Sequence, residues 1–227
     1  MMTDGIAPKD ARRALHFDIS YRETVRLKDG SVVSLRLVQP SDKQLLQRGL
    51  ERLSPRSRYL RFFTSKLSLS EAELDYLTRV DNVAHLAIGA VRKNSEGEEE
   101  GLGIARFVRS KTRPDHAEAA VAVVDDWQNK GLGATLLLRL SAAAKERGIE
   151  YFTAEVLRVN RGIRTLLAAL PPQLVEPIGQ DAVQVRLELP EIAQDSTMLP
   201  EGSELSRVLR MTGKDELVVE PAGLRSS

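Results

Sequence analysis

The sequence predicts an α/β protein with a central mixed, mostly antiparallel sheet flanked by helices. Three observations support this fold class. Short apolar or alternating runs, which are typical of strands, come in blocks along the chain. Amphipathic runs at helical spacing separate these blocks. One strand–helix–strand unit stands late in the chain, and such a unit joins parallel strands, so the sheet is expected to be mixed with helices on both faces.

The first two strands are expected within residues 21–40. Alternating valines and leucines stand on both sides of Asp29 and Gly30, and Asp-Gly between two such runs is a strong hairpin signal. A helix over 41–53 follows, because its leucines recur at helical spacing behind a Ser-Asp pair that can cap it. Residues 54–63, rich in arginine and aromatic residues, are expected to form a short helix or turn.

The next block is a helix followed by a hairpin and a central strand. Ser70 and Glu73 precede an apolar helical stripe in a capping-box pattern. Residues 84–110 contain two apolar runs around a charged turn and predict a hairpin. Residues 117–124 hardly alternate between apolar and polar side chains, so this strand is expected to be buried on both faces.

The last predicted elements alternate between helix and strand. We expect a helix over 133–147, a strand over 151–157, a helix over 160–170 and a last strand over 182–190. Two prolines directly after the second of these helices would end it, because proline cannot continue a helix.

The chain of 227 residues suits one domain with tails. We expect an N-terminal tail over 1–20, a single domain over 21–190 and a C-terminal extension of uncertain order over 191–227. Within this extension, 211–219 could form a short hairpin.

The composition argues against several classes of protein. The chain has 33 basic and 32 acidic residues, so no general attraction to nucleic acid or to an anionic membrane is expected. It has no cysteine, which removes disulfides and thiolate chemistry. No apolar run approaches the roughly 20 residues of a membrane span, and no secretory signal is apparent, so a cytoplasmic location is expected. His16, His85 and His116 lack metal-ligand spacing, and no metal site is expected.

Residues 125–140 place two glycines, Gly131 and Gly133, at the mouth of a helix and behind Gln128 and Lys130. The first turn of a helix leaves its N–H groups without internal partners, and the helix dipole adds partial positive charge there. Glycine allows close approach to these amides, and the lysine can add a positive charge. The loop therefore predicts a site for a phosphate or pyrophosphate.

Two common phosphate motifs do not fit this loop. A Walker A loop requires a lysine and a hydroxyl residue after its last glycine, and no such run occurs. The dinucleotide fingerprint would need a third glycine where the chain has Leu136. A tight turn that binds nothing is the plain alternative for the same glycines.

The loop QNKGLGA at 128–134 resembles the Q/R-x-x-G-x-G/A pyrophosphate loop of the GNAT family of N-acetyltransferases. The segments LSPRSRYLRFF, AEAAVAVVDDWQNKGLG and NRGIRTLL look like the acetyltransferase domain of bacterial protein-lysine acetyltransferases. The resemblance covers roughly residues 30–190.

The resemblance implies a site for acetyl-CoA. The pantetheine would lie along strand 117–124, where this strand splays from strand 151–157, and would bond to backbone groups of the first. The loop amides would hold the pyrophosphate. The cofactor-binding residues that the resemblance implies are Val121, Val123, Val124, Gln128, Asn129, Lys130, Gly131, Leu132, Gly133, Ala134 and Asn160.

Glu118 is the candidate catalytic residue. From the residues alone, it is either a base in low-dielectric surroundings or a solvated strand end beside Asp115 and His116. The resemblance implies the first, because a glutamate at this strand position serves as general base in the lysine acetyltransferases. A base is needed since a lysine, with a pKa of about 10.4, must lose a proton before it attacks. A backbone N–H near Val123 would meet the oxyanion.

The chain departs from the family pattern at two places. Many members carry a tyrosine late in helix 160–170 that protonates the leaving thiolate, and this chain has Leu167 in that register. The general acid is therefore unassigned, and water is an alternative. A common Gly-Phe pair after the helix is replaced by Pro171 and Pro172.

The resemblance implies an N-acetyltransferase that uses acetyl-CoA and a primary amine, with a protein lysine as the first candidate acceptor. A small-molecule amine acceptor on the same fold is one alternative, because a fold does not determine a substrate. A non-catalytic, acyl-CoA-binding regulatory module is another. The sequence indicates neither the preferred acyl chain nor the oligomeric state.

Overall fold

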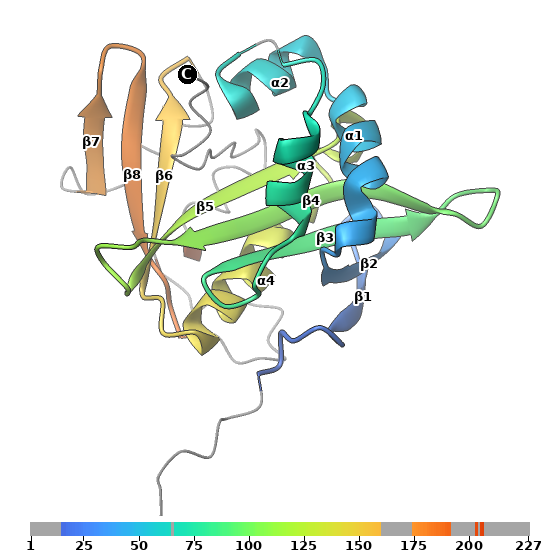
Figure 1. Cartoon of the computed structure of the whole chain (residues 1–227), viewed down its shortest axis with the longest axis horizontal. Helices are drawn as coiled ribbons and strands as arrows, with labels where there is room; N and C mark the ends of the chain where they lie inside the picture. The colour runs from blue at the N-terminus through green and yellow to red at the C-terminus, as the bar shows by residue number, and fades with distance from the viewer. Residues whose placement is uncertain (1–14, 65, 160–173, 192–202, 204, 207–227) are drawn as a thin grey trace, which may run out of the picture.

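The computed structural model describes residues 15–64, 66–159, 174–191, 203, 205 and 206. Within them, eight strands form one sheet in the order β1-β2-β3-β4-β5-β6-β8-β7 (Figure 1). The strands are β1 (Arg22–Arg26), β2 (Val32–Leu37), β3 (His85–Lys93), β4 (Glu99–Arg109), β5 (His116–Val123), β6 (Tyr151–Leu157), β7 (Val175–Ile178) and β8 (Ala182–Glu188). All neighbouring pairs are antiparallel except β5 and β6, which are parallel. The predicted mixed, mostly antiparallel sheet is confirmed.

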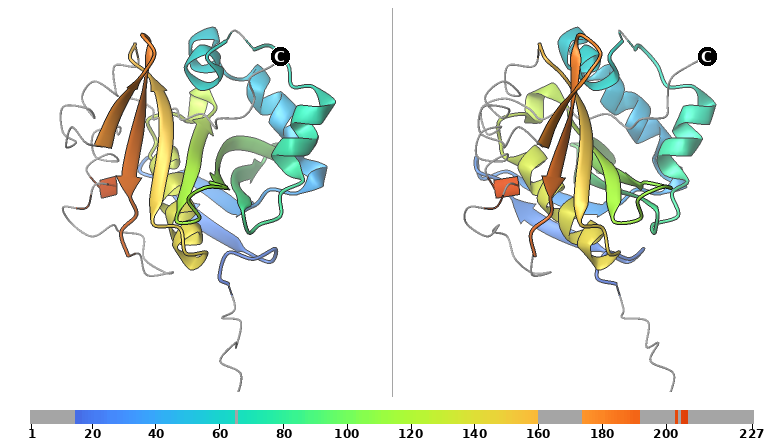
Figure 2. Two further views of the ribbon diagram at one scale, coloured as in Figure 1. Left: turned by 60° about the vertical axis from the view of Figure 1, so that its left-hand side comes forward. Right: turned by 90° about the vertical axis from the view of Figure 1, so that its left-hand side faces the viewer.

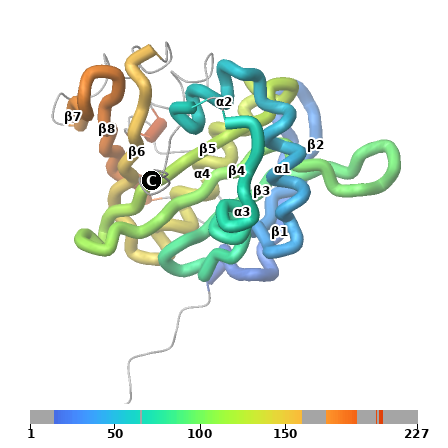
Figure 3. Tube along the Cα trace, turned by 45° about the horizontal axis from the view of Figure 1, so that its top comes forward, coloured from blue at the N-terminus to red at the C-terminus, as the bar shows by residue number. Residues whose placement is uncertain are grey.

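Helices cover both faces of this sheet. The described helices are α1 (Lys43–Glu51), α2 (Pro55–Phe62), α3 (Glu71–Thr78) and α4 (Leu132–Glu146). Figures 1 and 2 show α1, α2 and α3 on one face and α4 on the other, where it packs on β3, β4 and β5. In Figure 3, the strands β6, β8 and β7 stand to one side of β5, away from the first three helices. No described helix is long and apolar enough to cross a membrane.

Local sequence signals are confirmed where they are strongest. Gly30 has a φ of 85° in the turn between β1 and β2, which is the left-handed conformation that an Asp-Gly turn needs. Ser70 and Glu73 form the predicted capping box at the start of α3. Both faces of β5 are largely buried, as its lack of alternation predicted.

The domain includes residues on both sides of its predicted limits. Phe17, expected in a tail, is fully buried in the main core, and its N–H donates to Glu146 of α4 at 3.2 Å. Leu205, expected in the C-terminal extension, belongs to the same core. These two side chains therefore contribute to the core of the domain. The predicted helix over 160–170 and hairpin over 211–219 lie outside the described residues.

Strand β7 is an element that the sequence analysis missed. Its four residues contain Pro177, and a proline weakens a strand prediction because it cannot donate to a ladder. The strand lies at the edge of the sheet, where it pairs with β8 alone. An edge position is where a sheet tolerates proline.

Candidate active site

Strands β5 and β6 are paired over only part of their length. Their parallel register joins His116 to Tyr151, Ala117 to Phe152 and Glu118 to Thr153, and it ends there. Strand β5 continues to Val123, while β6 continues along β8 and turns away (Figure 1). An opening in the sheet therefore begins at Glu118, which confirms the splay that the resemblance implied.

The ladder between β4 and β5 determines which backbone groups face this opening. At one end the Ser110 N–H donates to His116 O at 2.9 Å, and at the other the Val124 N–H donates to Leu102 O at 3.0 Å. Antiparallel neighbours alternate between bonded and non-bonded pairs. The even-numbered residues of β5 thus bond to β4, and the odd-numbered ones direct their N–H and C=O groups toward the opening.

The three valines implied as cofactor contacts differ in whether their backbone groups face the opening. Val121 and Val123 direct backbone groups toward the opening, although the Val123 carbonyl also accepts a bond from Gln128 Nε2 at 3.2 Å. Both backbone groups of Val124 are already bonded, because its N–H donates to Leu102 and its C=O accepts from Trp127 at 2.8 Å. A cofactor contact from Val124 stays a prediction, and its N–H is not free to make it.

The loop before α4 presents a run of backbone N–H groups. Asn129 and Gly131 have φ values of 61° and 88°, so the chain turns sharply before the helix starts. Within the described residues, no N–H from Asn129 to Ala134 has a hydrogen-bond acceptor, and the next amide, that of Thr135, donates to Gly131 O at 3.0 Å. A run of unbonded amides at the start of a helix is a site for an anion.

The two glycines of the loop serve different purposes. Gly131 needs its glycine for the positive φ, and an added Cβ would come within 3.3 Å of the Lys28 side chain. Gly133 has no such conformation, and an added Cβ would meet only Val123 and Val121 at 3.6 and 4.0 Å, which is ordinary contact. Backbone freedom therefore explains the first glycine and not the second.

The polar side chains of the loop bond within the protein. The Lys130 ammonium pairs with Asp29 at 3.1 Å and lies over the Trp127 ring. The Gln128 amide donates to Asp125 at 2.9 Å. Hydrogen bonds from Ser31, with help from the lysine, lower the pKa of Asp29 to about 2. The positive character of the loop therefore comes chiefly from its backbone.

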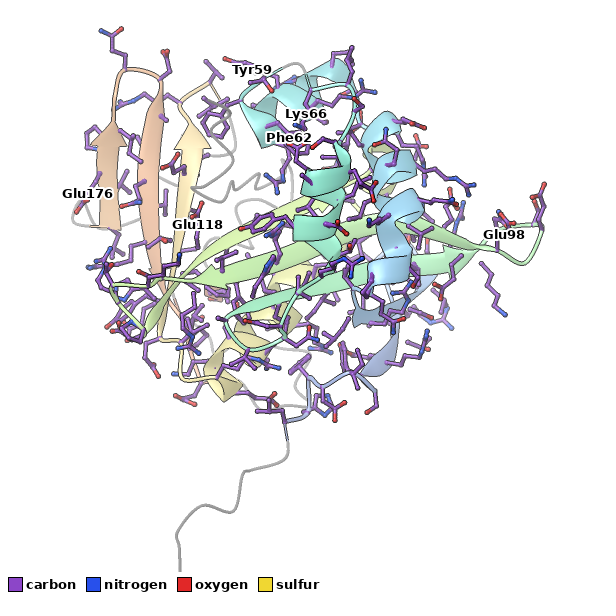
Figure 4. The ribbon with its side chains drawn as sticks, viewed as in Figure 1. Tyr59, Phe62, Lys66, Glu98, Glu118 and Glu176 are labelled. Atoms are coloured by element: carbon purple, nitrogen blue, oxygen red, sulfur yellow. The ribbon has the colours of Figure 1, made fainter. Side chains whose placement is uncertain are left out.

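Glu118 lies at the start of the opening and is partly buried. On β4, Val108 is the residue that pairs with Glu118, and Arg106 pairs with Ala120. The glutamate and the arginine therefore lie diagonally to each other on the same face of the sheet. This face is the one that α1, α2 and α3 cover, and Figure 4 shows Glu118 beside β6 there. The residue thus lies between the opening and the helical layer and is partly buried. Its role as a base stays a prediction.

Arg106 and His85 are neighbours of Glu118 that the sequence analysis did not single out. Arg106 is 1% exposed, its Nη2 lies 2.6 Å from His85 Nε2, and its guanidinium lies over the Tyr76 ring. Burial, followed by the arginine's charge, lowers the pKa of His85 to about 4. Burial also lowers the pKa of Arg106, while Tyr76 and Glu118 oppose that shift. The available signal was one arginine inside the apolar run LGIARFV.

Three implied features cannot be placed. Asn160, Leu167 and the two prolines all lie outside the described residues. The N-terminus of the helix after β6, which the resemblance placed against the cofactor, therefore stays a prediction.

A splayed sheet beside a run of helix-start amides can hold an extended chain along β5 and an anion at the loop. The model of the acetyltransferase (GNAT) family matches residues 50–167. The chain belongs to this family and is an acyl-CoA-dependent N-acetyltransferase.

Individual relatives agree with this assignment. An acetyltransferase of Pseudomonas aeruginosa is 31% identical over 144 residues, which are 63% of this chain and 76% of the relative. Acetyltransferase Pat of Mycolicibacterium smegmatis is 30% identical over 169 residues, 74% of this chain, but the chain spans only 49% of that protein. The crystal structure of the GNAT domain of S. lividans PAT has a TM-score of 0.64 and 28% identity, covering 74% of this chain and 97% of that domain.

Proposed function

We propose that the protein transfers an acetyl group from acetyl-CoA to a primary amine, with a protein lysine as acceptor and Glu118 as general base. The observation that carries this proposal is the run of unbonded amides from Asn129 to Ala134 beside the opening between β5 and β6. A charged diphosphate and an extended amide chain are the two parts of CoA that such a surface fits.

The residues that would hold the cofactor come from two elements. The amides of Asn129–Ala134 would bond to the pyrophosphate, and the backbone groups of Val121 and Val123 would bond to the pantetheine as an added strand. The side chains of Gln128 and Lys130 hold the loop rather than the ligand in this arrangement. Asn160 stays a proposed contact from the sequence.

Acetyl-CoA supplies a thioester, whose acyl carbon forms a bond to the amine nitrogen as its bond to sulfur breaks. Glu118 accepts the proton that the amine loses, directly or through one water. Its place at the start of the opening supports this role, because the proposed path of the thioester passes there. Since Leu167 stands where many family members carry a tyrosine, we propose water as the proton donor to the thiolate. A backbone N–H of β5 near Val123 would stabilise the oxyanion.

The lysine acceptor rests on the sequence resemblance to bacterial protein-lysine acetyltransferases. Beside Glu118, the strands β6 and β8 place Thr153, Glu155 and Arg186 on one face, partly exposed. A polar face of this kind suits the approach of an amine on a larger molecule. The cytoplasm stays the proposed location.

The test is thiol release from acetyl-CoA in the presence of lysine peptides or of small amines. The wild type should release thiol with the peptides, and Glu118→Gln should lower kcat by about 10²–10⁴-fold while CoA affinity stays unchanged. Glu176→Gln on β7, an exposed glutamate of the same sheet, is the control and should keep full activity.

Two results would contradict the proposal. Tight CoA binding with no turnover on any amine would favour a non-catalytic acyl-CoA-binding module. Turnover on small amines alone would replace the lysine with a small-molecule acceptor.

A further inference from the structure

A cavity of about 170 Å³ lies between the sheet and the layer formed by α1, α2 and α3. Its walls are mainly apolar, and Figures 1 and 4 show the helices that cover it. The apolar wall includes Leu45, Leu46, Leu50, Phe62 and Leu77 from the helical layer and Leu69 from the segment before α3. Apolar cavities of roughly 150 Å³ bind a molecule the size of benzene, so this one has room for a chain of a few carbon atoms.

Most of the charged groups along this cavity are paired with one another. Arg36 bonds to Asp42 at 2.7 Å, and Lys66 pairs with Glu73. Arg61 is buried and also has a partner. These groups leave little charge for a ligand to meet.

Arg106 is different. It lines the cavity from β4 and is 1% exposed. Within the part of the chain that the structure describes, its Nε and Nη1 have no hydrogen-bond partner, whereas Nη2 meets His85. Tyr76 and the charge of Glu118 also stabilise the guanidinium, but neither supplies a partner for these two nitrogens. A buried cation with unbonded N–H groups is unfavourable unless an acceptor meets it. A carboxylate is the acceptor that a guanidinium bonds to most readily in an apolar setting.

We propose that the cavity binds a short apolar chain that ends in a carboxylate, and that Arg106 bonds to this carboxylate. The proposal rests on the function proposed above and extends it to the choice of substrate. Ala122 and Val123 of β5 line the cavity together with Val124, which follows the strand, so one strand borders both the cavity and the opening for the pantetheine. An acyl group on the thioester could therefore reach the cavity.

Either substrate, the acyl donor or the amine acceptor, could carry an apolar chain that ends in a carboxylate. On the donor side, the chain would be the acyl group of a dicarboxylic acid, such as the succinyl group of succinyl-CoA. On the acceptor side, it would be the carbon chain of an amine that also carries a carboxylate, such as free lysine. Glu118, the base for the amine, is not among the residues that line the cavity, and this favours the donor.

The donor arm compares the affinities of succinyl-CoA, butyryl-CoA and CoA by calorimetry. Succinyl and butyryl groups have equal chain length and differ in the carboxylate. The wild type should bind succinyl-CoA about tenfold more tightly than butyryl-CoA, the effect of one charge-assisted bond. Arg106→Met should abolish this preference, and Arg106→Lys should restore part of it. Arg109→Met, on the opposite face of the same strand, should leave it unchanged.

A second variant covers the case in which Arg106→Met does not fold. Ala122→Leu would fill the cavity without touching the arginine, because Ala122 lines it from β5. This variant should bind CoA normally and lose affinity for both succinyl-CoA and butyryl-CoA.

The acceptor arm keeps acetyl-CoA as donor and compares kcat/KM for lysine and for cadaverine, which lacks the carboxylate. If the carboxylate preference depends on Arg106 in the acceptor arm alone, the carboxylate belongs to the acceptor. If it depends on Arg106 in the donor arm alone, the carboxylate belongs to the acyl group. CoA binding with no carboxylate preference in either arm would overturn this inference alone. A wild type that does not bind CoA would overturn the proposed function as well.

Discussion

The loop before α4 and the cavity beneath α1, α2 and α3 flank the same strand, β5, but they present different chemistry. The loop offers backbone amides from Asn129 to Ala134, and its charged side chains are paired within the protein. The cavity has mainly apolar walls, and among the described residues that line it the buried Arg106 has unbonded N–H groups. A backbone surface suits a group common to every acyl-CoA, whereas one side chain suits a group that varies between substrates.

This difference determines which substitutions should matter. In the loop, only residues that set the path of the backbone should affect binding. In the cavity, the removal of one guanidinium should change substrate preference without affecting CoA itself.

The largest effect is expected from Gly131→Asp. The new residue would have to adopt a φ near 88° and would place a carboxylate beside the pyrophosphate site. Charge repulsion at this distance should weaken CoA binding by about 100-fold or more. Calorimetric titration with CoA measures this.

A matched control separates charge from backbone strain. Gly97, in the turn between β3 and β4, has a φ of 82° and open space around it. Gly97→Asp requires a similar positive φ away from the loop, without the contact that Lys28 makes at Gly131, and should bind CoA like the wild type. Equal loss of binding in both variants would contradict the assignment of the loop.

A smaller effect is expected from the pH dependence of stability at His85. Its pKa is lowered to about 4 in the folded protein, by burial first and by Arg106 second, while Asp81 acts in the opposite direction. The unfolded chain binds a proton near the ordinary pKa of about 6.5. Folding stability should therefore fall as the pH drops from about 6.5 to about 4, because the unfolded state takes up the proton first.

His85→Gln keeps an acceptor for Arg106 but does not titrate. Urea unfolding at pH 7 and at pH 4.5 should show a smaller loss of stability in this variant than in the wild type. Equal losses in the two proteins would show that the histidine is not held neutral beside the arginine.

The smallest effect is expected from Gly133→Ala. An added Cβ would make only ordinary contacts with Val123 and Val121, so CoA affinity should change by less than about threefold. Thermal unfolding should show equal or higher stability, since alanine exceeds glycine in helix propensity by about 1 kcal/mol. A large loss of affinity would mean that the cofactor lies directly over this residue.

The sequence predicted those features that depend on neighbouring residues. The hairpin at Gly30, the capping box at Ser70 and the glycine loop before α4 each carry a signal within a few positions. Glu118 could be singled out because one carboxylate stood in an apolar strand, but its place at the end of the β5–β6 pairing depends on register between distant segments.

The features that the sequence analysis missed depend on contacts across the fold. Arg106 meets His85 and Tyr76 only because β3, β4 and α3 pack together. Phe17 joins the core through α4, far along the chain. Neither contact has a local pattern that a reader of the sequence could recognise.

The most direct test of the central claim is an NMR titration of the amide-labelled protein with CoA. The largest shifts should occur at the amides from Asn129 to Ala134 and at the odd-numbered residues of β5 from Ala119 to Val123, with small shifts at the even-numbered ones. Shifts that avoid the loop, or that leave β5 unchanged while CoA binds, would contradict the claim that these backbone groups form the cofactor site.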